Sequence, residues 1–168
     1  MSEFASRRVM MVDTQVRPSD VTKFPIIDAM LTVPRELYVP ETRREAAYVG
    51  ENLDIGGGRV VLEARTLAKL LDALDIQPDE LALDLGSGLG YSAAVIARLA
   101  GTVVAVEEDE SLAAEAGRLL SEEGVDNAIV LTEALTAGAA KHAPYDVITV
   151  EGGIEILPDA IMQSLRDG

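Results

Sequence analysis

An acidic residue and three closely spaced glycines occur together in the segment Asp84–Gly90, which reads Asp-Leu-Gly-Ser-Gly-Leu-Gly. Glycines let the backbone turn tightly and let a ligand approach without a Cβ atom in the way. The spacing is G-x-G-x-G, whereas the dinucleotide fingerprint is G-x-G-x-x-G, and Tyr91 stands where its third glycine would fall. The loop therefore predicts a site for a nucleoside that lacks phosphates. Its candidate ligand-binding residues are Asp84, Gly86, Ser87, Gly88 and Gly90.

Glu107 is a further candidate for binding the same ligand, because it follows Gly86 by 21 residues. An acid at about that distance, at the end of the next strand, accepts hydrogen bonds from ribose hydroxyls in nucleotide-binding α/β folds. The three acids at 108–110 instead suit a solvated helix start, where the helix dipole favours negative charge. We therefore expect Glu107 to hold the sugar.

The elements that position these residues alternate between strand and helix from residue 63 onward. Apolar runs predict strands over 81–85, 102–106, 128–131 and 146–150. Apolar residues at helical spacing predict helices around 67–74, over 91–100 and over 111–121. Strands separated by helices imply right-handed crossovers and a parallel sheet that is covered on both faces. The predicted fold is α/β, a doubly wound parallel sheet with its ligand site beyond the carboxyl ends of the strands.

The first 60 residues differ in composition, since they contain four of the seven prolines and both phenylalanines. Pro25 suits the first turn of a short helix over 26–31, and the three glycines at 56–58 predict a flexible joint. We expect an N-terminal helical cap over residues 1–60 and a ligand-binding α/β domain over 61–168. A sheet of four strands would leave one edge bare, so the chain is expected to be a truncated form of a longer protein that has further C-terminal strands.

The composition excludes several kinds of chemistry. Lys and Arg total 14 against 29 Asp and Glu, so the net charge is −15, which argues against nucleic acid and against an anionic membrane surface as partners. The absence of cysteine excludes disulfides and thiolate nucleophiles, and a single histidine leaves no expected metal site. No targeting segment and no run of about 20 apolar residues is visible, so a cytoplasmic location is expected.

Several short motifs outside the glycine loop occur together and in a fixed order. They are Met30, Val33-Pro34-Arg35-Glu36, Tyr38-Val39-Pro40, Ala47-Tyr48, Ala143-Pro144-Tyr145-Asp146-Val147-Ile148, Leu157-Pro158 and Gln163-Ser164-Leu165. With Asp84–Gly90 and Glu107, they resemble the motifs of class I S-adenosylmethionine-dependent methyltransferases, and more specifically of the protein-L-isoaspartate O-methyltransferase family. The resemblance extends from about residue 11 to the last residue.

The resemblance implies a Rossmann-like methyltransferase fold and methyl transfer from S-adenosylmethionine to the side-chain carboxylate of L-isoaspartyl residues, a repair reaction on damaged proteins. The implied cofactor is S-adenosylmethionine, and the implied partner is a protein or peptide substrate; the oligomeric state is left open. Such a transfer needs little acid–base machinery, because the carboxylate is already ionised near neutral pH and the methyl group sits on a charged sulfonium. The lack of a histidine or cysteine centre is therefore no objection.

The chain departs from the family pattern at two places. Leu62 stands where the family has a serine beside the reacting carboxylate, and it offers no hydrogen bond. Glu63 would repel an incoming carboxylate unless Arg65 neutralises it, which makes Leu62 and Arg65 the candidate catalytic positions. The family's Gly-Asp-Gly near the adenine is represented by Glu133-Ala134-Leu135, which adds Glu133 and Ala134 to the candidate cofactor-binding residues.

Two alternatives to isoaspartyl methylation stay open at this point. Leu62 and Glu63 suit a methyltransferase of the same fold with another methyl acceptor. The short C-terminus suits a non-catalytic nucleoside-binding module.

Overall fold

The structure, a computed structural model, describes residues 2–167. Its central sheet has four parallel strands, which are β3 Leu81–Leu85, β4 Thr102–Glu107, β5 Ala128–Thr132 and β6 Val147–Val150. Their spatial order is β5-β4-β3-β6. Each strand lies within one residue of its predicted bounds. The apolar runs of β3 and β4 are buried on both sheet faces, as in the centre of a parallel sheet, whereas the outer strand β5 is only partly buried.

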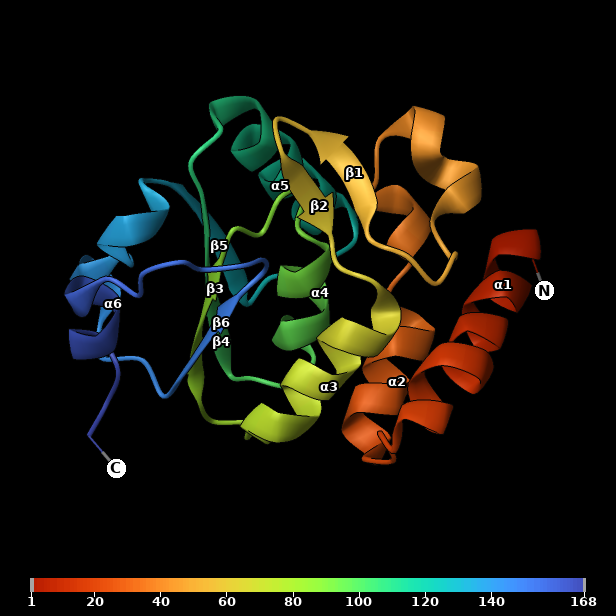
Figure 1. The fold of residues 1–168 in the computed structure, drawn as a ribbon, viewed down its shortest axis with the longest axis horizontal. Helices are drawn as coiled ribbons and strands as arrows, with labels where there is room; N and C mark the ends of the chain where they lie inside the picture. The colour runs from red at the N-terminus through yellow and green to blue at the C-terminus, as the bar shows by residue number, and fades with distance from the viewer. Residues whose placement is uncertain (1, 168) are drawn as a thin grey trace.

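Helices cover both faces of this sheet, as the doubly wound prediction requires (Figure 1). Alternate residues of each strand face opposite ways, so Ala82 and Val103 join one core cluster, whereas Leu83 and Val104 join another. The first cluster packs under α3 Ala64–Leu74, α4 Tyr91–Ala97 and α5 Glu110–Glu122, and the second under α6 Asp159–Gln163 with the 3-10 turns Leu135–Ala137 and Ala140–His142. Helix α4 ends three residues earlier than predicted, because residues 98–100 form a turn.

The N-terminal segment is helical, as predicted, and packs on the α3–α4 side of the sheet (Figure 1). It contains α1 Glu3–Met11, a π turn Val12–Val16, a 3-10 turn Arg17–Ser19, α2 Phe24–Thr32 and two further 3-10 turns, Arg35–Leu37 and Glu41–Ala46. Pro25 lies in the first turn of α2, where its missing N–H costs nothing. One core cluster extends from Met11 in this segment to Val147 in the sheet.

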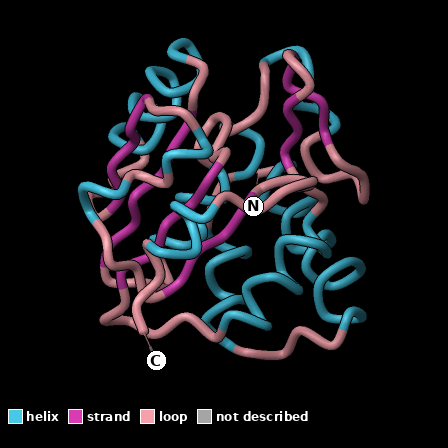
Figure 2. Tube along the Cα trace, turned by 60° about the vertical axis from the view of Figure 1, so that its left-hand side comes forward, coloured by secondary structure: helices cyan, strands magenta, loops and turns pink. Residues whose placement is uncertain are grey.

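The prediction of a flexible joint at 56–58 was wrong. These glycines form the turn of a two-stranded antiparallel hairpin, β1 Leu53–Gly56 and β2 Arg59–Val61. All three have positive φ values, of 94°, 61° and 75°. Glycine tolerates positive φ, which suits a tight turn as well as a linker. The hairpin stands apart from the four-stranded sheet (Figure 2).

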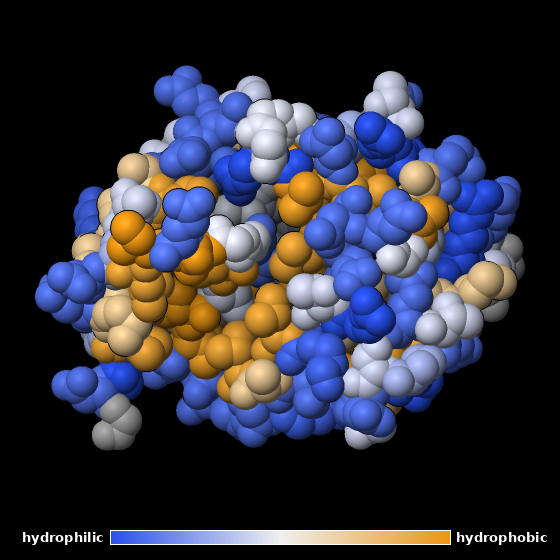
Figure 3. Space-filling model, viewed as in Figure 1, coloured by the Kyte–Doolittle hydropathy of each residue, from blue (hydrophilic) through white to orange (hydrophobic). Residues whose placement is uncertain are grey.

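An apolar groove runs beside the edge strand β6, between α3 and α6 (Figure 3). It is lined mainly by aliphatic side chains, among them Leu74, Ile148, Leu157, Met162 and Leu165. Among residues 2–167, no helix has the length and apolar character needed to cross a membrane.

Candidate active site

The glycine loop between β3 and α4 forms the floor of a crevice at the carboxyl end of the sheet. Gly86, Gly88 and Gly90 have φ values of 80°, 57° and 98°, which residues with a Cβ atom rarely adopt. The backbone N–H groups of Gly86 and Ser87 donate to the Val106 carbonyl at 2.8 and 3.3 Å, which ties the loop to β4. The predicted loop residues therefore form a buried, fixed surface that carries no side chain at three positions.

Glu107 ends β4 with a fully buried side chain that faces this loop. Its Oε2 accepts from the backbone N–H of Gly88 at 2.9 Å, and its Oε1 accepts from the backbone N–H of Asp109 at 3.1 Å. Arg59 of the hairpin completes the environment with two bonds, Nη1 to Oε1 at 2.7 Å and Nη2 to Oε2 at 2.8 Å. The structure thus brings Gly88 and Glu107 together as predicted, and adds Arg59, which sequence reasoning missed.

Two further acids, Asp84 and Glu151, lie beneath the glycine loop, where β3 and β6 end. Asp84 is fully buried and accepts from Ser92 Oγ at 2.6 Å and from Thr149 Oγ1 at 2.9 Å. Burial raises the pKa of Asp84, although these two donors oppose the shift. Burial, followed by the negative charge of Asp84, raises the pKa of Glu151 well above its usual value.

The hairpin closes over the crevice from the opposite side. Val60 and Leu62 line a cavity of about 10 Å³ together with Gly86, Ser87 and Glu151. Leu62 is held there through its backbone, because its carbonyl accepts from Nη2 of the buried Arg35 at 2.9 Å. Leu62, where the resemblance implies a serine, therefore lines the crevice with an apolar side chain.

The Arg35 guanidinium links the N-terminal segment to this site. Its Nε donates to the Ala47 carbonyl at 2.6 Å, and its Cζ lies 4.8 Å from the centroid of the Tyr91 ring. Cation–π contact at this distance is favourable. Arg35 thereby fixes Leu62 relative to α4.

Arg65 is not in the crevice. Its side chain is 62% exposed and its Nη2 pairs with Glu63 Oε1 at 3.2 Å. It lines a separate surface cavity with Glu63 and Lys69. A hydrogen bond from Thr66, followed by one from Arg65, lowers the pKa of Glu63. Arg65 thus pairs with Glu63 at the surface, and it does not face Leu62 across the site.

Glu133 and Ala134 follow β5, beside the loop. Glu133 is half-buried and Ala134 is exposed. The next residue, Leu135, brings its Cδ1 within 3.9 Å of the position that a Cβ on Gly86 would occupy. The segment therefore reaches the rim of the crevice, where the sequence placed it.

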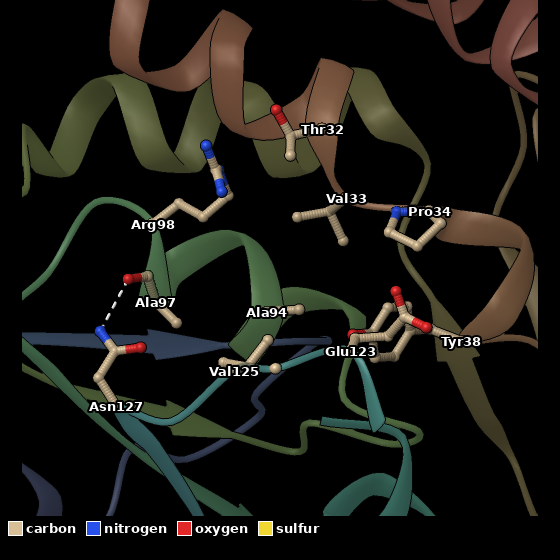
Figure 4. Close-up of a pocket in the computed structure, with 11 residues that line it drawn as sticks. Thr32, Val33, Pro34, Tyr38, Ala94, Ala97, Arg98, Glu123, Val125 and Asn127 are labelled. Carbon is tan, nitrogen blue, oxygen red and sulfur yellow. Dashed lines mark hydrogen bonds between the residues drawn. The ribbon is translucent and has the colours of Figure 1, made fainter. Parts of the chain in front are cut away.

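A further cavity beside α4 lies outside the crevice. It has a volume of about 400 Å³ and is lined by Val33, Arg98, Glu123 and Asn127 among others (Figure 4). Asn127 precedes β5 and donates to the Ala97 carbonyl at 2.8 Å, which places this cavity at the amino end of the sheet. None of its lining residues comes from the glycine loop or the hairpin.

The crevice has polar atoms suited to the cofactor that the sequence implies. Among residues 2–167, the buried Ser87 Oγ, Tyr91 OH and Glu151 Oε1 find no hydrogen-bond partner, although all three residues line the small cavity. Buried polar atoms are nearly always satisfied, so these three leave hydrogen-bonding capacity at one place for a bound ligand or water. The crevice therefore combines hydrogen-bonding groups, a glycine floor without side chains and the carboxylate of Glu107. This combination fits an amino acid joined to a nucleoside. These features define a nucleoside-binding α/β protein.

Comparison with known proteins gives the family. The family model for protein-L-isoaspartate(D-aspartate) O-methyltransferase matches residues 7–168. Similar proteins include a protein-L-isoaspartate O-methyltransferase of Syntrophus aciditrophicus, 34% identical over the whole chain and 77% of its own length. Another is protein-L-isoaspartate O-methyltransferase 2 of Pelobacter propionicus, 35% identical over 96% of this chain and 72% of its own. The chain belongs to this family of methyltransferases.

Solved structures confirm the fold. A protein-L-isoaspartate O-methyltransferase superposes with a TM-score of 0.81 at 23% identity, over 98% of this chain and 53% of that one. A protein described as a putative protein-L-isoaspartate O-methyltransferase from Plasmodium falciparum, in complex with S-adenosyl-L-homocysteine, gives 0.80 at 18% identity, over 99% and 81%.

Proposed function

We propose that this protein transfers the methyl group of S-adenosylmethionine to the side-chain carboxylate of L-isoaspartyl residues in damaged proteins. Membership of the family supports the reaction. The observation that carries it on this chain is Glu107, a fully buried carboxylate that faces a glycine floor at the carboxyl end of the sheet. An acid there suits a ribose, and the orphaned polar atoms beside it suit the amino-acid end of the cofactor.

In this proposal the residues of the chain act by binding and orientation. Glu107 would hold the ribose, and Ser87, Tyr91 and Glu151 would bind the amino-acid end of the cofactor. The bound cofactor supplies a methyl group on a positively charged sulfonium, which is an activated donor. An ionised acceptor carboxylate would take this methyl group as the bond from the methyl carbon to sulfur breaks, which would give a methyl ester and neutral S-adenosylhomocysteine without moving a proton.

Alignment is then the main contribution to catalysis. Holding nucleophile and methyl carbon in line can lower a barrier by up to roughly 7–11 kcal/mol in ideal cases. Val60 and Leu62 cover the crevice with apolar side chains, which would keep water from competing with the acceptor. This explains why a site without histidine or cysteine suffices.

A methyl-transfer assay on paired peptides tests the proposal. The substrate pair is one peptide containing an isoaspartyl residue and the same peptide with a normal aspartyl residue. Radiolabelled methyl from S-adenosylmethionine should enter the first and not the second. Leu62→Ser is the matched comparison, because it restores a hydroxyl at the family's position; it should raise kcat/KM severalfold through one added hydrogen bond and leave cofactor affinity unchanged.

Another acceptor is the second candidate, and a specific observation favours it. The hairpin offers Val60 and Leu62 instead of hydroxyls, while Glu151 places a carboxyl group in the same cavity. A site of this kind also suits an acceptor that donates a hydrogen bond. Cofactor binding without turnover of the isoaspartyl peptide, in the wild type and in Leu62→Ser alike, would favour this candidate over repair methylation.

A further inference from the structure

Glu107 has no acceptor capacity left for a ribose while Arg59 is in place. A carboxylate accepts about four hydrogen bonds, and Glu107 accepts four: two from the backbone N–H groups of Gly88 and Asp109 and two from Arg59. The Arg59 guanidinium also lies against the glycine floor, because its Nη2 is 2.8 Å from where a Cβ on Gly86 would be. If Glu107 binds the sugar, as the proposed function requires, then Arg59 and the ribose compete for the same two oxygen atoms.

Arg59 is placed to leave this position. It follows directly after the three glycines with positive φ that turn the hairpin. Its side chain is 21% exposed, so one side of the guanidinium already reaches solvent. Exchange also leaves Glu107 satisfied, because two ribose hydroxyls replace two guanidinium N–H donors. The exchange removes the positive charge beside a buried carboxylate, and this is the cost that the hydrogen bonds from the ribose must offset.

Once released from Glu107, the Arg59 guanidinium would lie beside the part of the crevice that an anionic acceptor must enter. Val60 and Leu62, on the same segment as Arg59, line the crevice. The other two arginines nearby are engaged: Arg35 donates to two backbone carbonyls, and Arg65 pairs with Glu63. The acids on the rim beside Arg59, Glu108 and Asp109, are exposed and hold a guanidinium only weakly.

We propose that Arg59 binds two carboxylates in turn, that of Glu107 before the cofactor binds and that of the isoaspartyl acceptor afterwards. The inference rests on the proposed function and goes beyond it, because it assigns a substrate-binding residue and an order of binding. Cofactor binding frees the positive charge that the acceptor needs, so the acceptor binds second. A guanidinium suits both partners, since its fork matches a carboxylate with two parallel bonds.

Arg59→Gln should have opposite effects on the two ligands. Binding of S-adenosylhomocysteine, measured by isothermal titration, should become about tenfold tighter, because the competing side chain is gone. The KM for the isoaspartyl peptide should rise by roughly tenfold or more, with a smaller change in kcat, because a charge pair to the acceptor is lost. Arg118→Gln, which removes an arginine from an exposed ion-pair cluster on α5, is the matched control and should change neither value.

A double-mutant cycle separates competition from an indirect effect on folding. In a Glu107→Gln background, Arg59→Gln should no longer tighten S-adenosylhomocysteine binding, since the contested carboxylate is absent. Arg59→Lys, which keeps the charge but loses the fork, should restore part of the acceptor affinity. Thermal unfolding of each variant shows that the protein tested is folded.

Each result decides one step. Unchanged or weaker S-adenosylhomocysteine binding by Arg59→Gln overturns the competition with ribose. Tighter binding with an unchanged KM overturns the acceptor role. If the wild type turns over no isoaspartyl peptide, the proposed function fails and the acceptor role with it, whereas the competition at Glu107 is still decided by the titration.

Discussion

The crevice has two walls of different character. One, the sheet wall, consists of the glycine loop Asp84–Gly90 and Glu107, and it is buried and tied together by backbone hydrogen bonds. The other, the hairpin wall, is the segment 59–62, which is half-exposed except at Val61. The sheet wall keeps the residues that the family resemblance implies for the cofactor. The hairpin wall contains Leu62, at the position where the resemblance implies a serine beside the acceptor.

The difference follows from what each wall must do. A cofactor is the same in every member of a family, so its wall needs fixed backbone geometry and one acid at a strand end. An acceptor depends on side chains that reach across the crevice from a two-stranded hairpin outside the main sheet. We therefore expect changes in the sheet wall to act on cofactor binding and changes in the hairpin wall to act on the acceptor.

The largest effect is expected at the sheet wall from Glu107→Gln. The amide loses the negative charge that would hold two ribose hydroxyls, and hydrogen bonds to a charged group contribute about 1.5–3 kcal/mol each. S-adenosylhomocysteine affinity, measured by isothermal titration, should fall roughly 100-fold.

Glu108→Gln is the control for this change. Glu108 is the next residue and is exposed, so removal of its charge should leave the affinity within about twofold. Equal losses in the two variants would mean that general negative charge attracts the cofactor, and that Glu107 has no special contact with the sugar.

The same contrast explains what the sequence predicts well. The strands were correct because each is a short apolar run between turn signals, and Glu107 was found because its position depends only on the next strand along the chain. Arg59 was missed because its partner lies 48 residues away and is set by how the hairpin folds back. The glycines at 56–58 were assigned to a joint because positive φ serves a linker and a hairpin turn alike.

Glu151 was missed for a related reason. It is one acid after an apolar strand, and its pairing with Asp84 depends on β6 lying next to β3. No local pattern shows that two strands so distant in sequence are neighbours. A useful signal would have been the strand order itself, because parallel neighbours place the residues after their carboxyl ends side by side.

A second prediction concerns this acid pair, which belongs to the sheet wall. Burial and Asp84 raise the pKa of Glu151 in the folded protein above its ordinary 4.5, so the folded state binds more protons than the unfolded state above that pH. Stability must therefore fall as the pH rises from about 4.5 towards the folded-state pKa. Glu151→Gln removes this titration and should be more stable than the wild type at pH 8, relative to pH 5, by roughly 1–3 kcal/mol in urea unfolding.

Glu155→Gln is the control for the pH effect. Glu155 is exposed in the same segment after β6, so this substitution should leave the difference between pH 5 and pH 8 as in the wild type. If Glu151→Gln behaves like Glu155→Gln, the acid pair does not hold its proton in the folded protein.

The smallest expected effect compares one glycine from each side of the crevice. Gly86 and Gly57 both have positive φ, of 80° and 61°, so alanine at either position should cost about 1–2 kcal/mol of stability. Their surroundings differ, because a Cβ on Gly86 meets Arg59 at 2.8 Å on the crevice floor, whereas a Cβ on Gly57 meets nothing within 4 Å. Gly86→Ala should therefore also weaken S-adenosylhomocysteine binding by about fivefold, and Gly57→Ala should leave it unchanged. Because the backbone strain is matched, a difference in affinity measures what the added Cβ meets on the crevice floor, which is the ligand or the Arg59 guanidinium. Repeating Gly86→Ala in an Arg59→Gln background separates the two; equal affinities for Gly86→Ala and Gly57→Ala there would show that the sheet wall gives the ligand no closer contact than the hairpin turn does.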